Sequence, residues 1–153
     1  MNWKVLILMA AALAPAYATA APDAPKYIGA GRSADGGSLP FSEGVLVGNT
    51  LHVAGHIGVD PKTGQAPQDP ETEAKLVMDS VQKTVQSAGL TMDDLVSVTI
   101  YCTDLALYDA FNKTYASYFH GKYPARAFIG VARLLRGAHF EVQGMAVKAP
   151  PGH

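Results

Sequence analysis

The spacing of apolar residues along this chain changes several times, and the first changes predict a hairpin followed by a helix. Short apolar runs lie on both sides of Gly48-Asn49, a two-residue connection that favours a tight β-hairpin, with regular structure expected from about Glu43. From Asp69 onward the spacing is helical, because Asp69 can cap a helix, Pro70 suits its first turn and Gly89 can end it. The apolar stripe of this helix consists of Ala74, Met78, Val81, Val85 and Ala88. The pattern predicts an amphipathic helix of about five turns whose stripe must be covered by a sheet.

The second half of the chain repeats the change from strand spacing to helix spacing. Residues 95–102 alternate between apolar and small polar side chains, and residues 105–120 return to helical spacing. The apolar run 127–132 and the alternating segment 137–147 then predict two final strands, which could lie side by side. The predicted order of elements is therefore β-β-α-β-α-β-β. Two helices on one face of a mixed sheet give an α+β fold, a sandwich of two layers.

The two ends of the chain differ in composition from its middle. Lys4 precedes the uninterrupted apolar run 5–13, and small residues at 16, 18 and 20 offer two signal-peptidase patterns. The run is too short to cross a bilayer, which needs about 20 apolar residues. We expect residues 1–20 to be a cleaved signal peptide, 21–39 a flexible lead-in rich in Ala, Gly, Pro and Ser, 40–149 the folded domain, and 150–153 a tail. The expected product is periplasmic or secreted, without stable membrane association.

Composition and charge narrow the class of protein further. The chain has 153 residues, enough for one domain with its own core after a signal peptide is removed. Charged residues make up 16% of the chain and the formal net charge is −1. No nucleic-acid partner is expected, because non-specific binding to phosphates needs a basic surface. The single cysteine, Cys102, cannot form an internal disulfide, and we expect it to be an inert thiol buried in a strand.

One arginine is the main candidate for chemistry. The sequence Tyr123-Pro124-Ala125-Arg126 places a permanently charged guanidinium beside the apolar run 127–132. A half-buried guanidinium needs an anion, which is either part of a ligand or a carboxylate of the protein such as Asp104 or Asp109. Residue type alone favours the protein carboxylate, because paired arginines are common inside proteins.

The histidines do not form a comparable site. His52 and His56 are four residues apart, which on a strand separates them by about 13 Å, too far to share a metal ion. We expect no metal, and we expect His56 to be a satisfied polar group at a strand end, with His120 and His139 facing solvent. The aromatic residues expected to pack rather than to stack on bases are Tyr115, Tyr118 and Phe119.

Longer motifs surround Arg126 and carry a family resemblance. They are Leu39-Pro40-Phe41-Ser42-Glu43-Gly44, the segment 52–61, the helix 71–89, and the region 112–147 with its Pro-Ala-Arg sequence. In order and spacing, over about 110 residues, they resemble the RidA/YjgF family of reactive-intermediate deaminases. The resemblance implies a chorismate-mutase-like fold, assembled as a homotrimer with pockets between subunits. It also implies hydrolysis of 2-imino acids, of the 2-iminobutanoate and 2-iminopropanoate type, to 2-keto acids and ammonia, without a cofactor.

The resemblance implies a set of site residues as well. Arg126 matches the arginine that holds the substrate carboxylate in that family. Asn112 matches an asparagine near the pocket, and Gly55 matches a glycine whose backbone lines it. Phe128 is expected to influence which substrate side chain fits.

Three positions depart from the family pattern. Phe41 stands where most members have a tyrosine and would line the substrate pocket, and Ala54 stands where many have a serine. Gln143 stands where the deaminases have a glutamate that is assigned to orient the attacking water. An amide can hold a water molecule by a hydrogen bond but cannot accept its proton. Glu141, about 7 Å away on the same face of the strand, is a candidate substitute.

These residues support three hypotheses for function. The first is a RidA-like hydrolase of 2-imino acids, in which Arg126 binds the carboxylate and Gln143 places the water. The alternative is a non-catalytic binder of small carboxylates on the same fold, which keeps Arg126 and has lost the chemistry. The third, an endoribonuclease or translation inhibitor, comes from older labels of the family. The expected export and the lack of a basic surface argue against it.

Overall fold

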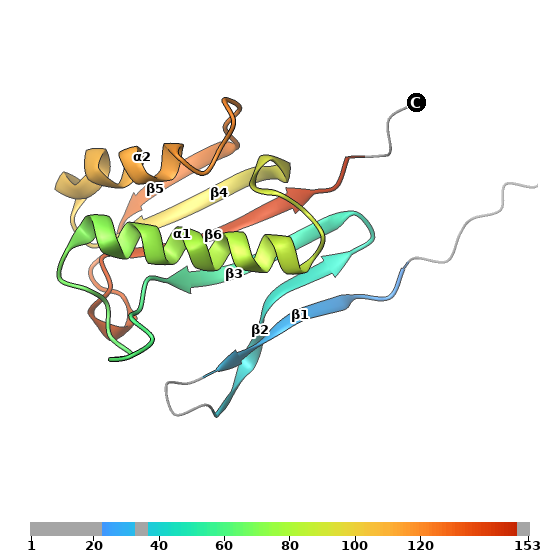
Figure 1. Cartoon of the computed structure of the whole chain (residues 1–153), viewed down its shortest axis with the longest axis horizontal. Coiled ribbons are helices and arrows are strands. Elements are labelled where there is room, and N and C mark those ends of the chain that lie inside the picture. The colour runs from blue at the N-terminus through green and yellow to red at the C-terminus, as the bar shows by residue number, and fades with distance from the viewer. Residues whose placement is uncertain (1–22, 33–36, 150–153) are drawn as a thin grey trace, which may run out of the picture.

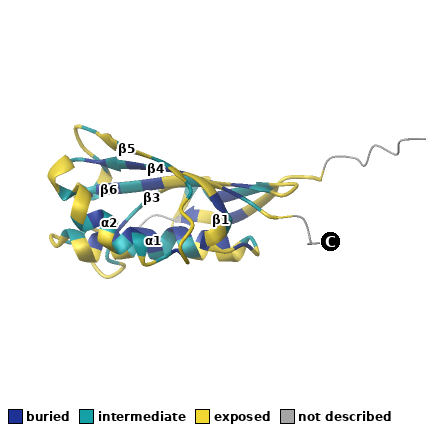
Figure 2. Ribbon diagram, turned by 90° about the horizontal axis from the view of Figure 1, so that it is seen from above, coloured by how far each residue is buried: buried dark blue, intermediate teal, exposed yellow. Residues whose placement is uncertain are grey.

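The computed structural model describes residues 23–32 and 37–149, so the predicted signal peptide (1–20) and tail (150–153) lie outside the described residues. The elements in chain order are β1 (Lys26–Arg32), β2 (Ser38–Val47), β3 (Thr50–Ile57), α1 (Pro70–Ser87), β4 (Leu95–Cys102), α2 (Tyr108–Ala116), β5 (Ala125–Gly130) and β6 (Phe140–Val147), with 3₁₀ turns at Met92–Asp94, Leu105–Leu107 and Leu135–Gly137. The strands form one mixed sheet in the order β1-β2-β3-β6-β4-β5. Both helices lie on one face of this sheet and leave the other face uncovered (Figures 1 and 2). The prediction of a two-layer α+β sandwich is confirmed.

The first hairpin and the first helix form where the sequence predicts them. Val47 and Thr50 pair across the turn Gly48-Asn49, and Gly48 has φ +57°, a conformation that glycine adopts without strain. The side chain of Asp69 caps α1, since Oδ2 accepts a hydrogen bond from the Thr72 backbone N at 2.9 Å. The buried side chains of α1 include Ala74, Val77, Met78, Val81 and Val85, which pack against the sheet. The helix-period pattern therefore gave the correct buried face.

The segment expected to be a flexible lead-in contains a strand instead. β1 pairs antiparallel with β2, with Ile28 opposite Gly44 and Tyr27 opposite Val45. Ile28 is its buried apolar residue (4% exposed), and Gly29 and Ala30 next to it give no alternation. Backbone hydrogen bonds to β2 hold the strand in place. Such bonds do not depend on side chains, so the sequence shows no hydrophobic period here. The order of elements is therefore β-β-β-α-β-α-β-β, and the prediction for residues 26–32 was wrong.

The last two strands do not lie beside each other. β4 lies between them, parallel to β5 and antiparallel to β6, so the predicted pairing of these two strands was wrong. Four side chains of β4 are buried, Leu95, Val98, Ile100 and Cys102, and a strand so buried takes an interior place in the sheet. Periodicity marks which side chains of a strand point inward, but it carries no information about the neighbouring strand.

The register of these three strands decides which side chains share a face. Residues directly opposite each other in a ladder point to the same side of the sheet. Arg126 is opposite Val98, whose side chain is buried beneath the helices. Gln143 is opposite the next residue, Thr99, and therefore points to the uncovered face. The two residues predicted to act together lie on opposite faces of one sheet.

Two polar side chains, Glu73 and His139, connect α1 to the start of β6. The carboxylate of Glu73, which is fully buried, accepts hydrogen bonds from the backbone N of His139 at 2.6 Å and of Phe140 at 2.8 Å. Its other oxygen lies 2.6 Å from Nδ1 of His139. The expectation that His139 faces solvent was wrong, because a buried carboxylate binds both its ring and its backbone.

The single thiol is buried, as predicted. Cys102 has no exposed surface, and its Sγ donates a hydrogen bond to the carbonyl oxygen of Asp104 at 3.0 Å. Burial raises the pKa of the thiol above its usual value, which keeps it protonated and unreactive at neutral pH. No helix in residues 23–32 and 37–149 is long and apolar enough to cross a membrane.

Candidate functional site

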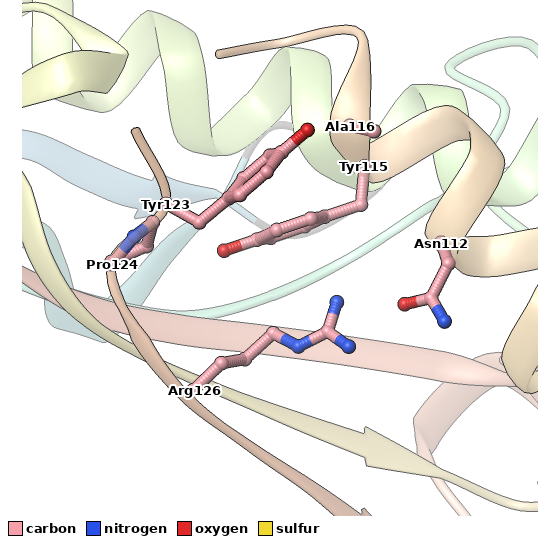
Figure 3. Close-up of a pocket in the computed structure, with 6 residues that line it drawn as sticks. All are labelled: Asn112, Tyr115, Ala116, Tyr123, Pro124 and Arg126. Atoms are coloured by element: carbon pink, nitrogen blue, oxygen red, sulfur yellow. The ribbon is translucent and has the colours of Figure 1, made fainter. Parts of the chain in front are cut away.

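Arg126 projects from β5 into a pocket between the sheet and α2. The cavity has a volume of about 310 Å³, and Figure 3 shows the side chains that line it. The residues that line it are Asn112, Tyr115, Ala116, Tyr123, Pro124 and Arg126. Asn112 and Tyr115 come from α2, whereas Tyr123 and Pro124 precede β5. Two of the predicted site residues, Arg126 and Asn112, therefore do lie in one pocket.

The guanidinium of Arg126 is surrounded by aromatic rings. Its central carbon lies 4.8 Å from the ring centroid of Tyr115, 5.6 Å from that of Tyr108 and 5.9 Å from that of Phe128. The Tyr115 ring extends along the arginine side chain, with the guanidinium beneath it (Figure 3). Aromatic faces attract a cation, by about 0.5–2 kcal/mol for each well-placed ring, without neutralising its charge. The rings hold the guanidinium in place and leave its charge available.

No carboxylate of the described residues pairs with Arg126. The ion pairs in this part of the chain have Lys75, Lys113, His120 and His139 as their basic partners. The side chain of Arg126 makes one hydrogen bond there, in which Nη2 donates to the hydroxyl of Tyr108 at 3.3 Å. A half-buried guanidinium with an aromatic surround and no anion of its own is suited to bind an external anion.

The two acids that were candidates for pairing with Arg126 have other roles. Asp104 accepts a hydrogen bond from the backbone N of Ala106 at 3.0 Å and so caps the 3₁₀ turn before α2. Asp109 lies exposed in the first turn of α2, where a carboxylate is favoured by the helix dipole. The observed contacts therefore favour a ligand anion over an internal ion pair for Arg126.

Tyr115 has a second property that concerns the pocket. Its side chain is only 3% exposed, and its hydroxyl has no hydrogen-bond partner within residues 23–32 and 37–149. Burial raises the pKa of this phenol to about 12, although the nearby Arg126 acts in the opposite direction. The hydroxyl is therefore protonated at neutral pH. The prediction that Tyr115 packs in the core is right, and the residue also forms a wall of the site.

The aromatic part of the site was missed in the sequence. Tyr108, Asn112 and Tyr115 occupy positions i, i+4 and i+7 of α2, so they form one stripe facing Arg126. This spacing was visible in the sequence, but a tyrosine at helical spacing is usually a core residue. Its significance depends on β5 running beneath that stripe, which only the fold decides.

The remaining predicted site residues are not among those that line this pocket, although one of them is adjacent to it. Phe128 is next to the pocket, in contact with the guanidinium. Gln143 is exposed on the uncovered face, where Nε2 donates to the hydroxyl of Tyr101 at 3.0 Å. Phe41, on β2, is 51% exposed and is not among the residues that line the Arg126 pocket. One chain alone therefore brings together Arg126, Asn112 and Phe128, but not Gln143.

Gly55 and Glu141 form a second close pair. A Cβ atom at Gly55 would collide with the carboxylate of Glu141, so the absence of a side chain lets the acid lie over β3. Burial raises the pKa of Glu141 above its usual range. Glu141 shares its face with Gln143, which lines a shallow hollow of about 360 Å³ on the uncovered side of the sheet. Any proton acceptor near Gln143 would come from this face.

The described residues contain no group of three or more His, Cys, Asp or Glu side chains placed to hold a metal ion. His56 is turned toward α1, and its Nε2 lies 3.3 Å from the hydroxyl of Thr84. This contact agrees with the expected role of His56 as a satisfied polar group.

Fold and pocket together define a small α+β protein in which the described residues give Arg126 no carboxylate partner inside its pocket. A model of the family described as Endoribonuclease L-PSP matches residues 34–148. The chain is 36% identical over 112 residues to the 2-iminobutanoate/2-iminopropanoate deaminase of Escherichia coli (strain K12), an alignment that covers 71% of this chain and 88% of that protein. The chain therefore belongs to this family, which includes the RidA and YjgF proteins.

Solved structures agree with this assignment. The YjgF gene product from E. coli superposes with a TM-score of 0.72 at 34% identity, over 81% of this chain and 99% of that one. The structure of E. coli TdcF with bound serine superposes with a TM-score of 0.72 at 32% identity, over 81% of this chain and all of that one. The fold implied by the resemblance is confirmed.

Proposed function

We propose that this protein hydrolyses small 2-imino acids, of the 2-iminobutanoate and 2-iminopropanoate type, to 2-keto acids and ammonia. The observation that carries the proposal is Arg126, a cation to which residues 23–32 and 37–149 supply no carboxylate, in a pocket of about 310 Å³. A cavity of this size admits a molecule of a few carbon atoms. The relative named 2-iminobutanoate/2-iminopropanoate deaminase, at 36% identity, supports the reaction.

Imine hydrolysis requires the protein to bind the substrate carboxylate, to position a water molecule and to transfer protons. Arg126 binds the carboxylate through paired N–H donors and so orients the neighbouring imine carbon. Water then adds to this carbon to form a carbinolamine, which loses ammonia and leaves the keto acid. Proton transfer during these two steps needs an acid or base, and such a group typically contributes about 10²- to 10⁴-fold in rate. Gln143 can place the water by a hydrogen bond, but it cannot take its proton.

The assembled protein is proposed to be a homotrimer in which neighbouring subunits complete each site. In one chain Arg126 faces the helices and Gln143 faces the uncovered side of the sheet. Both can approach one ligand only if the second residue belongs to another subunit. Met145, an apolar side chain on the uncovered side that is 36% exposed, supports an interface there.

A binding protein without catalytic activity is the second candidate. The observation in its favour is Gln143, an amide hydrogen-bonded to Tyr101 at 3.0 Å in the position where a carboxylate is expected. Such a protein would retain Arg126 and bind 2-keto acids without turnover. The nucleic-acid hypothesis has no comparable support, because the formal net charge of the chain is −1.

The experiment is a competition assay with a matched control. An amino-acid oxidase generates the imine, semicarbazide traps what is left, and the protein competes for it. Arg126→Gln should lower the rate at least about tenfold, because a charge-assisted hydrogen-bonded pair is lost. Arg133→Gln, at an exposed arginine outside the pocket, should keep the wild-type rate.

The outcomes distinguish the two candidates. If wild-type protein does not accelerate hydrolysis but binds 2-ketobutyrate in an Arg126-dependent way, the binding protein is correct. If wild-type protein is active and Arg126→Gln is equally active, Arg126 is not the carboxylate site and the proposal fails.

Export is a separate proposal, based on Lys4, the apolar run 5–13 and the small residues up to 20. The mature chain should begin at Thr19 or Ala21 and appear in the periplasmic fraction or the medium. N-terminal sequencing of the purified native protein tests this. Recovery of the full-length chain from the cytosol would contradict it.

A further inference from the structure

The hydroxyl of Tyr108 is the one hydrogen-bond partner that the described residues give to Arg126 (3.3 Å from Nη2). Tyr108 is the first residue of α2, and its ring meets Phe128 edge to face, with centroids 5.0 Å apart and an interplanar angle of 82°. The ring also lies within cation–π distance of the guanidinium. Three contacts thus determine where this hydroxyl lies, although the side chain is 43% exposed.

The direction of the bond determines what the hydroxyl can still do. A guanidinium has only donors, so the Tyr108 oxygen is the acceptor and its own O–H must point away from Arg126. Within residues 23–32 and 37–149, no acceptor receives that proton. Because the side chain is partly exposed, a ligand bound to Arg126 can reach it. The free O–H is therefore an unused donor beside the anion site.

Arg126 keeps enough donors for its own ligand. The guanidinium has five N–H bonds, of which Tyr108 uses one, and a carboxylate takes two. In a 2-substituted carboxylate, the substituent on C2 is adjacent to the carboxylate carbon. Tyr108 stands at the margin of the Arg126 pocket, so a carboxylate that binds on the Nη2 side of the guanidinium brings its C2 substituent toward the Tyr108 hydroxyl.

We propose that Tyr108 determines specificity, by donating a hydrogen bond to an acceptor atom on C2 of the carboxylate that Arg126 holds. The proposal rests on the proposed function, and it names the preferred class as carboxylates with a C2 acceptor, a keto oxygen or a neutral imine nitrogen. A 2-amino acid presents an ammonium group at C2, which has donors only and cannot accept this bond. An unsubstituted carboxylate has nothing at C2 to bind.

The experiment combines one change in the protein with one change in the ligand. Dissociation constants of 2-ketobutyrate and butyrate are measured by calorimetry for wild-type protein and for Tyr108→Phe. Tyr108→Phe should raise the dissociation constant of 2-ketobutyrate about threefold to tenfold and leave that of butyrate unchanged. The reason is that one neutral hydrogen bond is lost, and only the keto acid makes it. Tyr27→Phe, at a 70% exposed tyrosine of β1, is the control and should change neither constant.

Each other result overturns the inference in a recognisable way. Equal weakening of both ligands would mean that the hydroxyl only positions Arg126. Unchanged binding of both would mean that Tyr108 takes no part. Arg126→Gln is measured in parallel, and it should weaken both ligands because both have a carboxylate. If it weakens neither, or if neither ligand binds wild-type protein, the proposed function itself fails.

Discussion

Arg126 shows how a single charged residue can be held in place without being neutralised. Aromatic faces from α2 and β5 contact its guanidinium, and the one hydrogen bond that it makes within the described residues is donated to an uncharged phenol oxygen, that of Tyr108. A carboxylate in the same place would fix the side chain equally well, but it would compete with every incoming anion. The aromatic surround leaves the positive charge available for a ligand.

His56 allows a prediction about acid stability at the same scale. Its ring is packed beneath α1, 3.3 Å from the Thr84 hydroxyl, and burial lowers its pKa below the usual 6.5, although Glu43 acts in the opposite direction. The unfolded chain therefore binds this proton more readily than the folded chain does. The contribution of His56 to stability is present above pH 6.5 and is lost as the pH falls below it.

The measurement is urea unfolding between pH 7 and pH 5. Wild-type protein should lose stability over this range, and His56→Gln should lose less. His52→Gln, at an exposed histidine of β3, should keep the wild-type slope. If His56→Gln and wild-type protein show the same slope, the acid sensitivity comes from another group.

Among the elements, α1 and β6 are connected by more than apolar packing. The Glu73 carboxylate binds two backbone N–H groups at the start of β6 and the ring of His139, in a place without exposed surface. These contacts lie where the β5–β6 connection ends, shortly after its 3₁₀ turn Leu135–Gly137. At this position of α1 the helix pattern alone would predict an apolar contact with the sheet. The structure has a buried carboxylate there instead, which contacts three nitrogen atoms of His139 and Phe140.

Removing one oxygen of this carboxylate should destabilise the fold. Glu73→Gln leaves one acceptor for backbone N–H groups and turns an amide donor toward the others, so we expect a loss of about 1–3 kcal/mol in the free energy of unfolding. Chemical denaturation measures it. Glu71→Gln is the matched control, because Glu71 is 58% exposed and its ion pair with Lys113 is long, at 3.4 Å. Similar losses in both variants would contradict a special role for Glu73.

At the scale of the whole molecule, the sheet has one face covered by helices and one without cover (Figure 2). Arg126 belongs to the first face and Gln143 to the second. In a trimer, one subunit can place its uncovered face beside the pocket of the next. The catalytic site would then exist only in the assembly, and sedimentation should give about three times the subunit mass.

Mixing variants tests this arrangement. The pure Arg126→Gln protein and the pure Gln143→Ala protein should each hydrolyse the imine slowly. If each site takes one residue from each of two subunits, co-refolded mixtures should regain activity, since random assembly restores about a quarter of the sites. Mixing Arg126→Gln with a double variant that carries both Arg126→Gln and Gln143→Ala should restore no activity, because neither protein supplies Arg126. No gain in the first mixture would mean that the two residues do not act across an interface, and full activity of Gln143→Ala alone would remove that residue from catalysis.

Features set by neighbours in the chain were determined by the sequence itself. The Gly48-Asn49 turn, the Asp69 cap and the buried stripe of α1 follow from local geometry and periodicity, and all three were predicted. The inward side chains of β4 were predicted only in part, because Val96 belongs to the apolar alternation but is 45% exposed, at a register shift between Leu95 and Ser97. Arg126 was predicted as the central site residue in a different way, because residue type alone favoured a protein carboxylate as its partner and the resemblance of the surrounding motifs to the RidA/YjgF family pointed to a ligand. These features depend on few residues at fixed spacing, which a single sequence displays directly.

Only the tertiary structure decided what lies next to what. β1 forms through backbone bonds to β2 and has no apolar period, so no pattern marked it. The insertion of β4 between β5 and β6 separates Arg126 from Gln143, and the stripe of α2 above β5 brings Tyr108 and Tyr115 to the guanidinium. Strand order and helix placement come from the packing of the entire core, in which every element competes for the same partners. For that reason the identity of the charged residue was determined by the sequence, and its surroundings were determined by the fold.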